Sequence, residues 1–321
     1  MSTATAASDT EYARSDDADV IARLGFEPEV RRVRERLVQW IDTTGEDMQP
    51  QLRWQFLARS KYFRPLTVFA CYRALHDGPI PDHIIMGAVA IEMFHNVSLV
   101  IDDILDASDE RRGVSTLHKQ FGSLPALMAS GYIVAEGYRF LAHDPFGIGL
   151  LSELLARLGV AECMQWRLRR KPLGVEDWRL IAGEDTGSMF EVCACMGTSD
   201  ETLRRYGRLL GTVYHGCDDV GDARGLEALG GGGDEDIRDG ILTLPAALAI
   251  RDPQLQTMFC RHDLSTTELD AMAQAVRAQI PAAEDYLDVV AREARTEALS
   301  RARNSEPLLA LLEHTRRLSG R

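Results

Sequence analysis

The chain has 321 residues, of which 45% are apolar, and this is enough to bury a large hydrophobic core. Lys and Arg number 36 against 49 Asp and Glu, so the formal net charge is −13. This balance disfavours nonspecific binding to nucleic acid or to an anionic membrane surface. An anionic substrate would need metal ions or a local cluster of basic side chains to bind it.

The N-terminal stretch "MSTATAASDTEYARSDDADV" is rich in Ser, Thr, Ala and Asp, and we expect residues 1–24 to be disordered. The stretch lacks the basic start and apolar core of a secretion signal, and no later run approaches eighteen consecutive apolar residues, so we expect no membrane span. The six cysteines show neither CxxC nor zinc-type spacing. These features favour a protein of the reducing cytoplasm.

The rest of the chain has the pattern of consecutive helices. Apolar residues recur at three- and four-residue spacing and are interrupted by short breaks such as "HDGPIPD" (76–82) and "HDPFG" (143–147). Alternating strand patterns are almost absent, so we predict an all-α fold with residues 25–321 in a single domain. The segment "GGGGDEDIRDG" (230–240) is either a surface loop or a mobile lid over a site.

Two acidic motifs each follow an apolar helical run. Both have acids at positions i, i+1 and i+4, which are Asp102, Asp103 and Asp106 in the first motif and Asp218, Asp219 and Asp222 in the second. Residues four apart lie on one helix face, so these carboxylates repel unless a multivalent cation lies between them. Oxygen ligands suit Mg²⁺. A single cluster is more typical of a solvated surface, but the repetition favours a metal site that binds a diphosphate.

Five motifs occur in a specific order: "KYFRP" (61–65), "HNVSLVIDDILDASDERRGVSTLHKQFG" (95–122), "DTGSMFE" (185–191), "CDDVGD" (217–222) and "DIRDGILTLP" (236–245). In order and spacing they resemble the trans-isoprenyl diphosphate synthases of the polyprenyl synthetase family, from about residue 50 to about residue 250. The resemblance implies a single-domain isoprenoid synthase bundle of helices around a deep central cavity, and we expect a homodimer.

The resemblance also implies a mechanism. Three Mg²⁺ ions, held by Asp102, Asp106 and Asp218, would draw off the diphosphate of an allylic substrate, and the double bond of isopentenyl diphosphate would attack the resulting carbocation. The other acids of the two motifs are expected in the same catalytic site.

Seven further residues fall at substrate-binding positions of the family: Lys61, Arg64, His95, Arg111, Arg112, Gln165 and Thr186. The first three are expected to bind isopentenyl diphosphate, because a guanidinium fork, an ammonium and an imidazole suit a diphosphate. Without the neighbouring motifs, the cations would be taken for exposed or snorkelling side chains. Gln165 could equally be an ordinary polar helix residue.

The chain departs from the family pattern around the allylic diphosphate. Asp185 replaces a lysine of the family's Lys-Thr-Gly, Ile241 replaces a later lysine, a loop lysine is missing from "GGGGDED", and Arg59-Ser60 replaces Gly-Gly. Each lost charge-assisted contact is worth about 1.5–3 kcal/mol. Three functions stay open: a chain-elongating prenyltransferase, a terpene cyclase that ionises a prenyl diphosphate, and a regulatory partner subunit of an active synthase.

The retained cations of the isopentenyl site favour the prenyltransferase, and the intact aspartates argue against the partner subunit. Product size is suggested by the residues before Asp102, where a bulky aromatic stops the growing chain in this family. Val97 and Ser98 are small, and Phe94 lies about two turns below, which favours a geranylgeranyl-sized product. Phe94 could instead be plain core packing.

Overall fold

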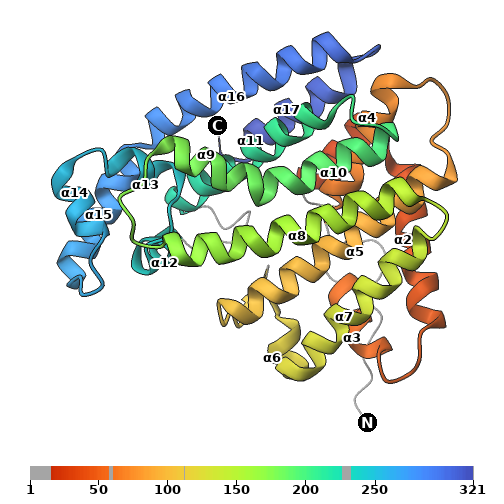
Figure 1. Ribbon diagram of the computed structural model, residues 1–321, viewed down its shortest axis with the longest axis horizontal. Coiled ribbons are helices and arrows are strands. Elements are labelled where there is room, and N and C mark those ends of the chain that lie inside the picture. Colours follow the sequence, from red (N-terminus) through yellow and green to blue (C-terminus); the bar gives the residue numbers. More distant parts are fainter. Residues whose placement is uncertain (1–15, 58–60, 112, 226–232, 321) are drawn as a thin grey trace. The chain divides into compact units, whose positions relative to one another are not determined.

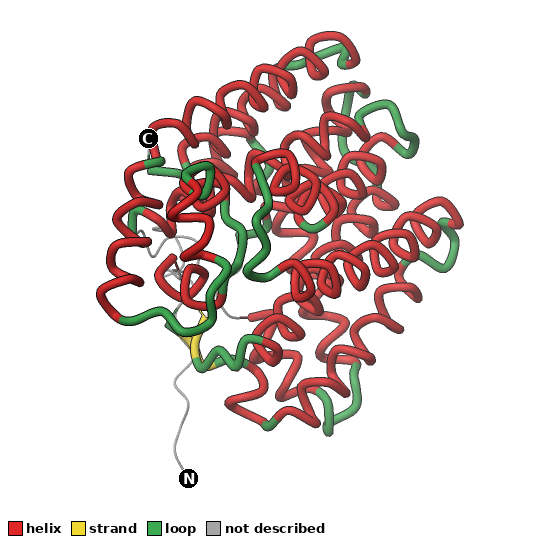
Figure 2. Tube along the Cα trace, turned by 60° about the vertical axis from the view of Figure 1, so that its left-hand side comes forward, coloured by secondary structure: helices red, strands yellow, loops and turns green. Residues whose placement is uncertain are grey.

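The computed structural model describes residues 16–57, 61–111, 113–225 and 233–320. These residues form seventeen helices and one two-stranded hairpin, so the all-α prediction is confirmed (Figures 1 and 2). The chain divides into two compact units. Unit 1 comprises the described residues up to Phe69 together with Ile80–Phe140, and unit 2 comprises Ala70–Pro79 and the described residues from Leu141 onward.

Unit 1 is organised around helix α5 (Asp82–Leu105), which packs along α7 (Ser123–Phe140) and against α2 (Glu27–Thr43). The buried face of α7 carries mostly small residues at helical spacing, so the two helices approach closely. The remaining elements are α1 (Asp16–Leu24), α3 (Gln49–Leu57), the start of α4 (Phe63–Leu75), β1 (Glu110–Arg111), β2 (Val114–Ser115) and α6 (Leu117–Phe121).

Helix α5 is the one helix among the described residues that is long and apolar enough to cross a membrane. Its most apolar stretch has a mean hydropathy of 1.8, and 78% of that stretch is buried inside the structure. The core helix of a soluble protein passes the same test of length and composition, so this is weak support for a membrane span.

Unit 2 is organised around helix α11 (Arg204–Ala223), which packs against α10 (Thr186–Thr198) and α16 (Ile280–Arg301). A Cβ on Gly207 would lie 2.4 Å from the carbonyl oxygen of Phe190, so glycine is required where α10 and α11 cross. The other helices are α8 (Pro145–Leu168), α9 (Val175–Glu184), α12 (Gly233–Asp239), α13 (Leu244–Ala249), α14 (Pro253–Phe259), α15 (Thr266–Ala278) and α17 (Glu306–Arg317).

Two carboxylates, one of them buried, tie four helices of unit 2 together. Glu191 on α10 is 4% exposed and accepts hydrogen bonds from Arg157 of α8 (2.7 Å) and Arg208 of α11 (2.9 Å). The same two arginines also bind Glu184 of α9, at 2.9 and 2.7 Å. Arg204 of α11 also donates to Glu191 at 3.3 Å, so Glu191 is shared by three guanidinium groups and Glu184 by two, which fixes the relative positions of these helices.

Two expectations need correction. Residues 16–24, which we expected to be disordered, form helix α1, and residues 1–15 lie outside the described residues. In the glycine-rich segment, Gly233–Asp239 form α12, whereas residues 230–232 lie outside the described residues. The single domain stays a prediction.

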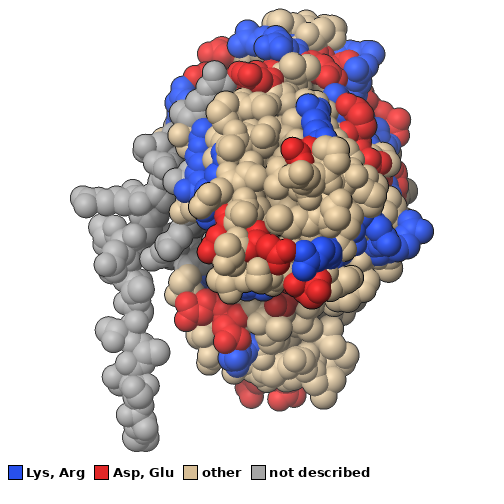
Figure 3. Space-filling view, turned by 90° about the vertical axis from the view of Figure 1, so that its left-hand side faces the viewer, with Lys and Arg blue, Asp and Glu red and all other residues tan. Residues whose placement is uncertain are grey.

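Charged side chains and cysteines are distributed over the described residues as follows. Acidic and basic side chains are interspersed on the face drawn in Figure 3. All six cysteines lie in the described part of the chain and are free thiols.

Candidate active site

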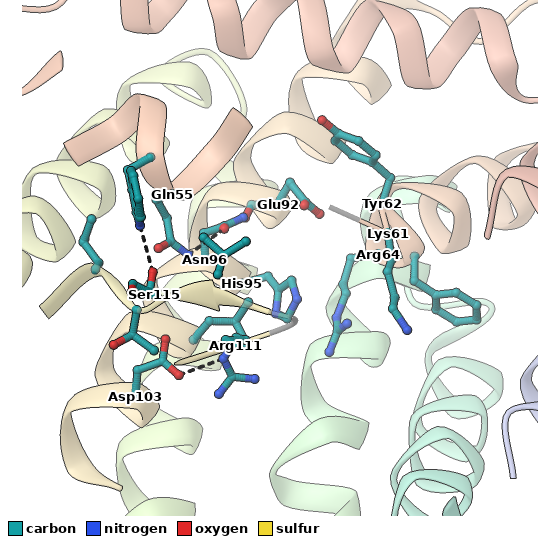
Figure 4. Close-up of a pocket in the computed structure, with 16 residues that line it drawn as sticks. Gln55, Lys61, Tyr62, Arg64, Glu92, His95, Asn96, Asp103, Arg111 and Ser115 are labelled. Atoms are coloured by element: carbon teal, nitrogen blue, oxygen red, sulfur yellow. Dashed lines mark hydrogen bonds and ion pairs between the residues drawn. The ribbon is translucent and has the colours of Figure 1, made fainter. Parts of the chain in front are cut away.

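A pocket in unit 1 collects four of the five cations assigned to substrate binding. Lys61, Arg64, His95 and Arg111 all line it, and Figure 4 shows them reaching it from the chain before α4, the first turn of α4, helix α5 and strand β1. The fifth, Arg112, lies outside the described residues, as do residues 59–60. An ammonium, two guanidinium groups and an imidazole on one pocket suit a polyanionic ligand.

The backbone at Tyr62 brings two of these cations to the same pocket. Tyr62 has a φ of 51°, which is uncommon for a residue other than glycine. Its carbonyl accepts the N–H of Leu66 at 2.9 Å, so α4 begins there. The turn in the chain direction lets Lys61 and Arg64, which lie on either side of Tyr62, line one pocket.

One face of α5 forms a wall of the pocket through residues at three- and four-residue spacing, which are Glu92, His95, Asn96, Leu99 and Asp103. The Asn96 side-chain oxygen accepts a hydrogen bond from Gln55 of α3 at 3.0 Å, and the Asn96 amide donates to the Glu92 carbonyl at 2.9 Å. Glu92, Asn96 and Gln55 are not among the residues predicted from the sequence. The helical spacing around His95 could have indicated the first two, whereas Gln55 reaches the pocket only through the tertiary fold.

The first aspartate motif ends helix α5. Asp106 is the C-cap, Ala107 has a φ of 53°, and the N–H of Ser108 donates to the Asp103 carbonyl at 3.0 Å, which closes the helix as in a Schellman motif. The C-terminal end of a helix carries partial negative charge. The carboxylates of Asp102 and Asp106 are therefore repelled by the partial negative charge at this helix end. A bound cation would relieve this repulsion.

The middle aspartate of this motif, Asp103, is bound by an arginine of the pocket. The Asp103 carboxylate is almost fully buried and accepts a hydrogen bond from Arg111 Nε at 2.7 Å. The β1–β2 hairpin carries Arg111 back over the end of α5, and Trp54 donates to the Ser115 carbonyl at 2.9 Å and so ties the hairpin to α3. Asp103 is therefore a positioning residue that connects the acidic helix end to the basic pocket.

The second motif repeats this arrangement in unit 2. Asp218, Asp219 and Asp222 lie in the last turns of α11. The middle acid, Asp219, accepts hydrogen bonds from Trp178 Nε1 at 2.7 Å and from the Leu244 N–H at 2.8 Å. In both motifs, protein donors hold the middle carboxylate.

A histidine that was not predicted from the sequence lies beside this second motif. His215 Nδ1 is 2.9 Å from the Thr186 hydroxyl and 3.4 Å from the Asp185 carboxylate, and Nε2 is 3.8 Å from Asp219. Burial disfavours the charged imidazole, but Asp219 and Asp185 outweigh this and raise the pKa of His215. Its position one turn before Asp218 was the signal in the sequence.

Asp236 adds a further carboxylate to the same region. Burial and the charges of Asp219, Asp222 and Asp218 raise the pKa of Asp236 to about 8. The Asp236 carbonyl accepts the N–H of Ile241 at 2.8 Å, which closes the C-terminal end of α12. The charges of Asp218, Asp219 and Asp222 thus act on Asp236 at this end of α11, and a bound cation would relieve their repulsion.

The donors fit Mg²⁺ in chemistry, because each motif presents carboxylates at i and i+4 at the negative end of a helix. Within the described ranges, no three His, Cys, Asp or Glu side chains form a ready metal-binding group. Divalent-metal binding by Asp102, Asp106 and Asp218 therefore belongs to the proposed function.

The remaining predicted residues are placed as follows. Phe94 and Val97 are buried in α5, at 2% and 3% exposure. Ser98 is partly exposed, and its hydroxyl donates to the His95 carbonyl at 2.9 Å. Gln165 lies partly exposed near the end of α8. Their roles stay predictions.

Comparison with known proteins supports the family suggested by the motifs. Residues 48–278 match the polyprenyl synthetase family. The chain is 28% identical over 257 residues to nonaprenyl diphosphate synthase of Mycobacterium tuberculosis, covering 76% of each chain. It is also 28% identical over 222 residues to geranylgeranyl pyrophosphate synthase 4 of Arabidopsis thaliana, covering 62% of this chain and 59% of the plant protein.

The fold matches as well. The crystal structure of a polyprenyl synthase from Caulobacter crescentus, complexed with calcium and isoprenyl diphosphate, has a TM-score of 0.82, with 23% identity over 94% of this chain and 97% of that one. The family match covers well over half of the chain and includes both aspartate motifs and the basic pocket. The chain therefore belongs to the polyprenyl synthetase family.

Proposed function

We propose that the protein is a Mg²⁺-dependent trans-prenyltransferase that condenses an allylic diphosphate with isopentenyl diphosphate. The observation that carries this proposal is the pocket of unit 1, where Lys61, Arg64, His95 and Arg111 come together. A site for isopentenyl diphosphate needs this set of donors, and a protein that only ionised one allylic diphosphate would not need it.

The aspartates of both motifs would act on the allylic diphosphate. Asp102, Asp106 and Asp218 would hold divalent cations, which would supply positive charge to the leaving diphosphate. Asp103 and Asp219 are held by Arg111 and Trp178, so they position the helix ends that carry the metal ligands. The pocket residues bind isopentenyl diphosphate and orient its double bond toward the allylic carbocation.

Product length is proposed to be geranylgeranyl-sized, with Phe94 as the floor below Val97 and Ser98. The burial of Phe94 supports a floor, since the ring is 2% exposed. The relatives carry names of both nonaprenyl and geranylgeranyl synthases, so resemblance alone favours neither length.

A homodimer is proposed through helix α7. Leu124, Leu127 and Met128 follow one another at helical spacing and are 69%, 46% and 57% exposed. An apolar stripe of this kind on a surface helix favours burial against a partner. A second copy of the chain is the expected partner, and size-exclusion chromatography with light scattering tests it: Leu127→Glu should yield monomers.

The activity is tested by incubating the purified protein and Mg²⁺ with dimethylallyl, geranyl, farnesyl and geranylgeranyl diphosphates, each with and without isopentenyl diphosphate. Products are analysed directly as organic extracts and again after phosphatase treatment. Longer prenyl alcohols that form only when isopentenyl diphosphate is present support the transferase.

A terpene cyclase is the second candidate, and the Asp185 carboxylate is the observation that favours it, because an acid stands where the family has a diphosphate-binding lysine. In the same assay a cyclase releases hydrocarbons or cyclic alcohols from an allylic diphosphate alone. Isopentenyl diphosphate would then remain unconsumed.

A further inference from the structure

The ring of Phe94 lies against a glycine of the neighbouring helix. A Cβ built on Gly137 of α7 would lie 2.6 Å from Phe94 Cε2, a distance that real Cβ atoms essentially never show, and 3.1 Å from Cδ2, which is tighter than nine in ten real contacts. Gly137 is itself buried. The ring therefore occupies space that any other residue at position 137 would fill.

The surroundings hold the ring in this place. Phe94 packs edge to face against Tyr138, with ring centroids 5.4 Å apart and an interplanar angle of 89°. The ring is 2% exposed, so it has little freedom to move without displacing neighbours. Position 137 consequently decides how far the ring sits toward α7.

We propose that Gly137 is a specificity-determining residue that sets product length by receiving the Phe94 ring. This inference rests on the proposed function, in which Phe94 is the floor of the product channel. A side chain at position 137 pushes the ring away from α7 and toward Val97 and Ser98, so the channel becomes shorter. A smaller residue at position 94 removes the floor, so the channel becomes longer.

The experiment compares product lengths of the full chain after phosphatase treatment and chromatography. Gly137→Ala should shift the product shorter by at least one isoprene unit, and Phe94→Ala should shift it longer. Gly131→Ala is the matched control, because Gly131 lies on the same helix and nothing lies within 4 Å of a Cβ built there. It should keep the wild-type product.

The double variant Gly137→Ala/Phe94→Leu guards against misfolding, since the smaller leucine leaves room for the new methyl group. It should fold, as checked by circular dichroism, and should make products longer than those of Gly137→Ala. A folded Gly137→Ala protein with wild-type or longer products overturns the inference alone. A wild-type protein that elongates no substrate overturns the proposed function and this inference with it.

Discussion

The Asp185 carboxylate lies 3.4 Å from the imidazole of His215, and Thr186 hydrogen-bonds the same ring nitrogen. The acid at position 185 is therefore next to the imidazole of His215 on α11, and its negative charge contributes to the raised pKa of that histidine. Changing one member of this pair leaves the other against an unsuitable neighbour.

This pair predicts strong coupling in a double-mutant cycle. Asp185→Lys alone should not tighten allylic binding, because the ammonium would lie beside the His215 imidazole. Combined with His215→Gln it should lower the KM for the allylic diphosphate, with a coupling of about 0.5–3 kcal/mol, roughly a 2- to 100-fold effect. Steady-state kinetics of the four proteins measure this. Strictly additive effects would show that the two residues act independently.

Arg64→Ala should affect one substrate far more than the other. It removes a charge-assisted contact worth about 1.5–3 kcal/mol, so the KM for isopentenyl diphosphate should rise roughly 10- to 100-fold. The KM for the allylic diphosphate should change little. Arg31→Ala, on the exposed face of α2, is the control and should leave both constants unchanged. Equal increases for the two substrates would contradict the assignment of this pocket.

Asp102→Ala and Asp218→Ala should each lower turnover by roughly a hundredfold or more, since metal-assisted ionisation supplies several kcal/mol. The helical content should stay the same by circular dichroism, because each change removes one of several repelling carboxylates. EDTA should abolish the wild-type activity and added Mg²⁺ should restore it. Activity that persists in EDTA would exclude the metal-dependent mechanism.

Asp236 predicts a pH-dependent stability. In the folded protein Asp236 keeps its proton up to about pH 8, whereas its ordinary pKa is 3.8. Between about pH 4 and pH 8 the folded state therefore binds more protons at Asp236 than the unfolded state does. The free energy of unfolding falls as the pH rises through this range. Asp236→Asn should therefore raise the melting temperature more at about pH 8.5 than at about pH 5, measured in EDTA. An equal gain at both values would mean that charge is not the cause.

Glu191→Ala should destabilise the fold by about 3 kcal/mol, because it leaves Arg157 and Arg208 without a buried shared carboxylate. Urea unfolding measures the change. Glu313→Ala removes an exposed ion pair with Arg317 and serves as the control, with an expected loss below about 1 kcal/mol. Similar losses of unfolding free energy in both variants would show that the buried network stabilises the fold no more than an exposed ion pair does.

The sequence predicted the all-α fold because helical periodicity is a local property of the chain. It also located the cations of the pocket, since Lys61, Arg64, His95 and Arg111 lie in recognisable motifs. Both breaks expected at "HDGPIPD" and "HDPFG" separate helices in the structure.

What the sequence could not supply are pairings between distant segments. The Asp185–His215 pair joins the residue between α9 and α10 to helix α11, and no periodicity connects them. The bond from Trp178 to Asp219 is of the same kind. The helix at Asp16–Leu24 was missed because its polar composition resembles that of a disordered segment.

Arg111 belongs to two structures at once, since it lines the basic pocket and holds Asp103 at the acidic end of α5. An anionic ligand that draws the Arg111 guanidinium toward the pocket would weaken the hydrogen bond from Arg111 to Asp103. A cation bound at the end of α5 would in turn change how strongly Arg111 binds an anion in the pocket. Linkage requires these effects to be equal in both directions. Through one side chain, filling either site would change the affinity of the other, so the occupancy of the two proposed sites would be thermodynamically coupled.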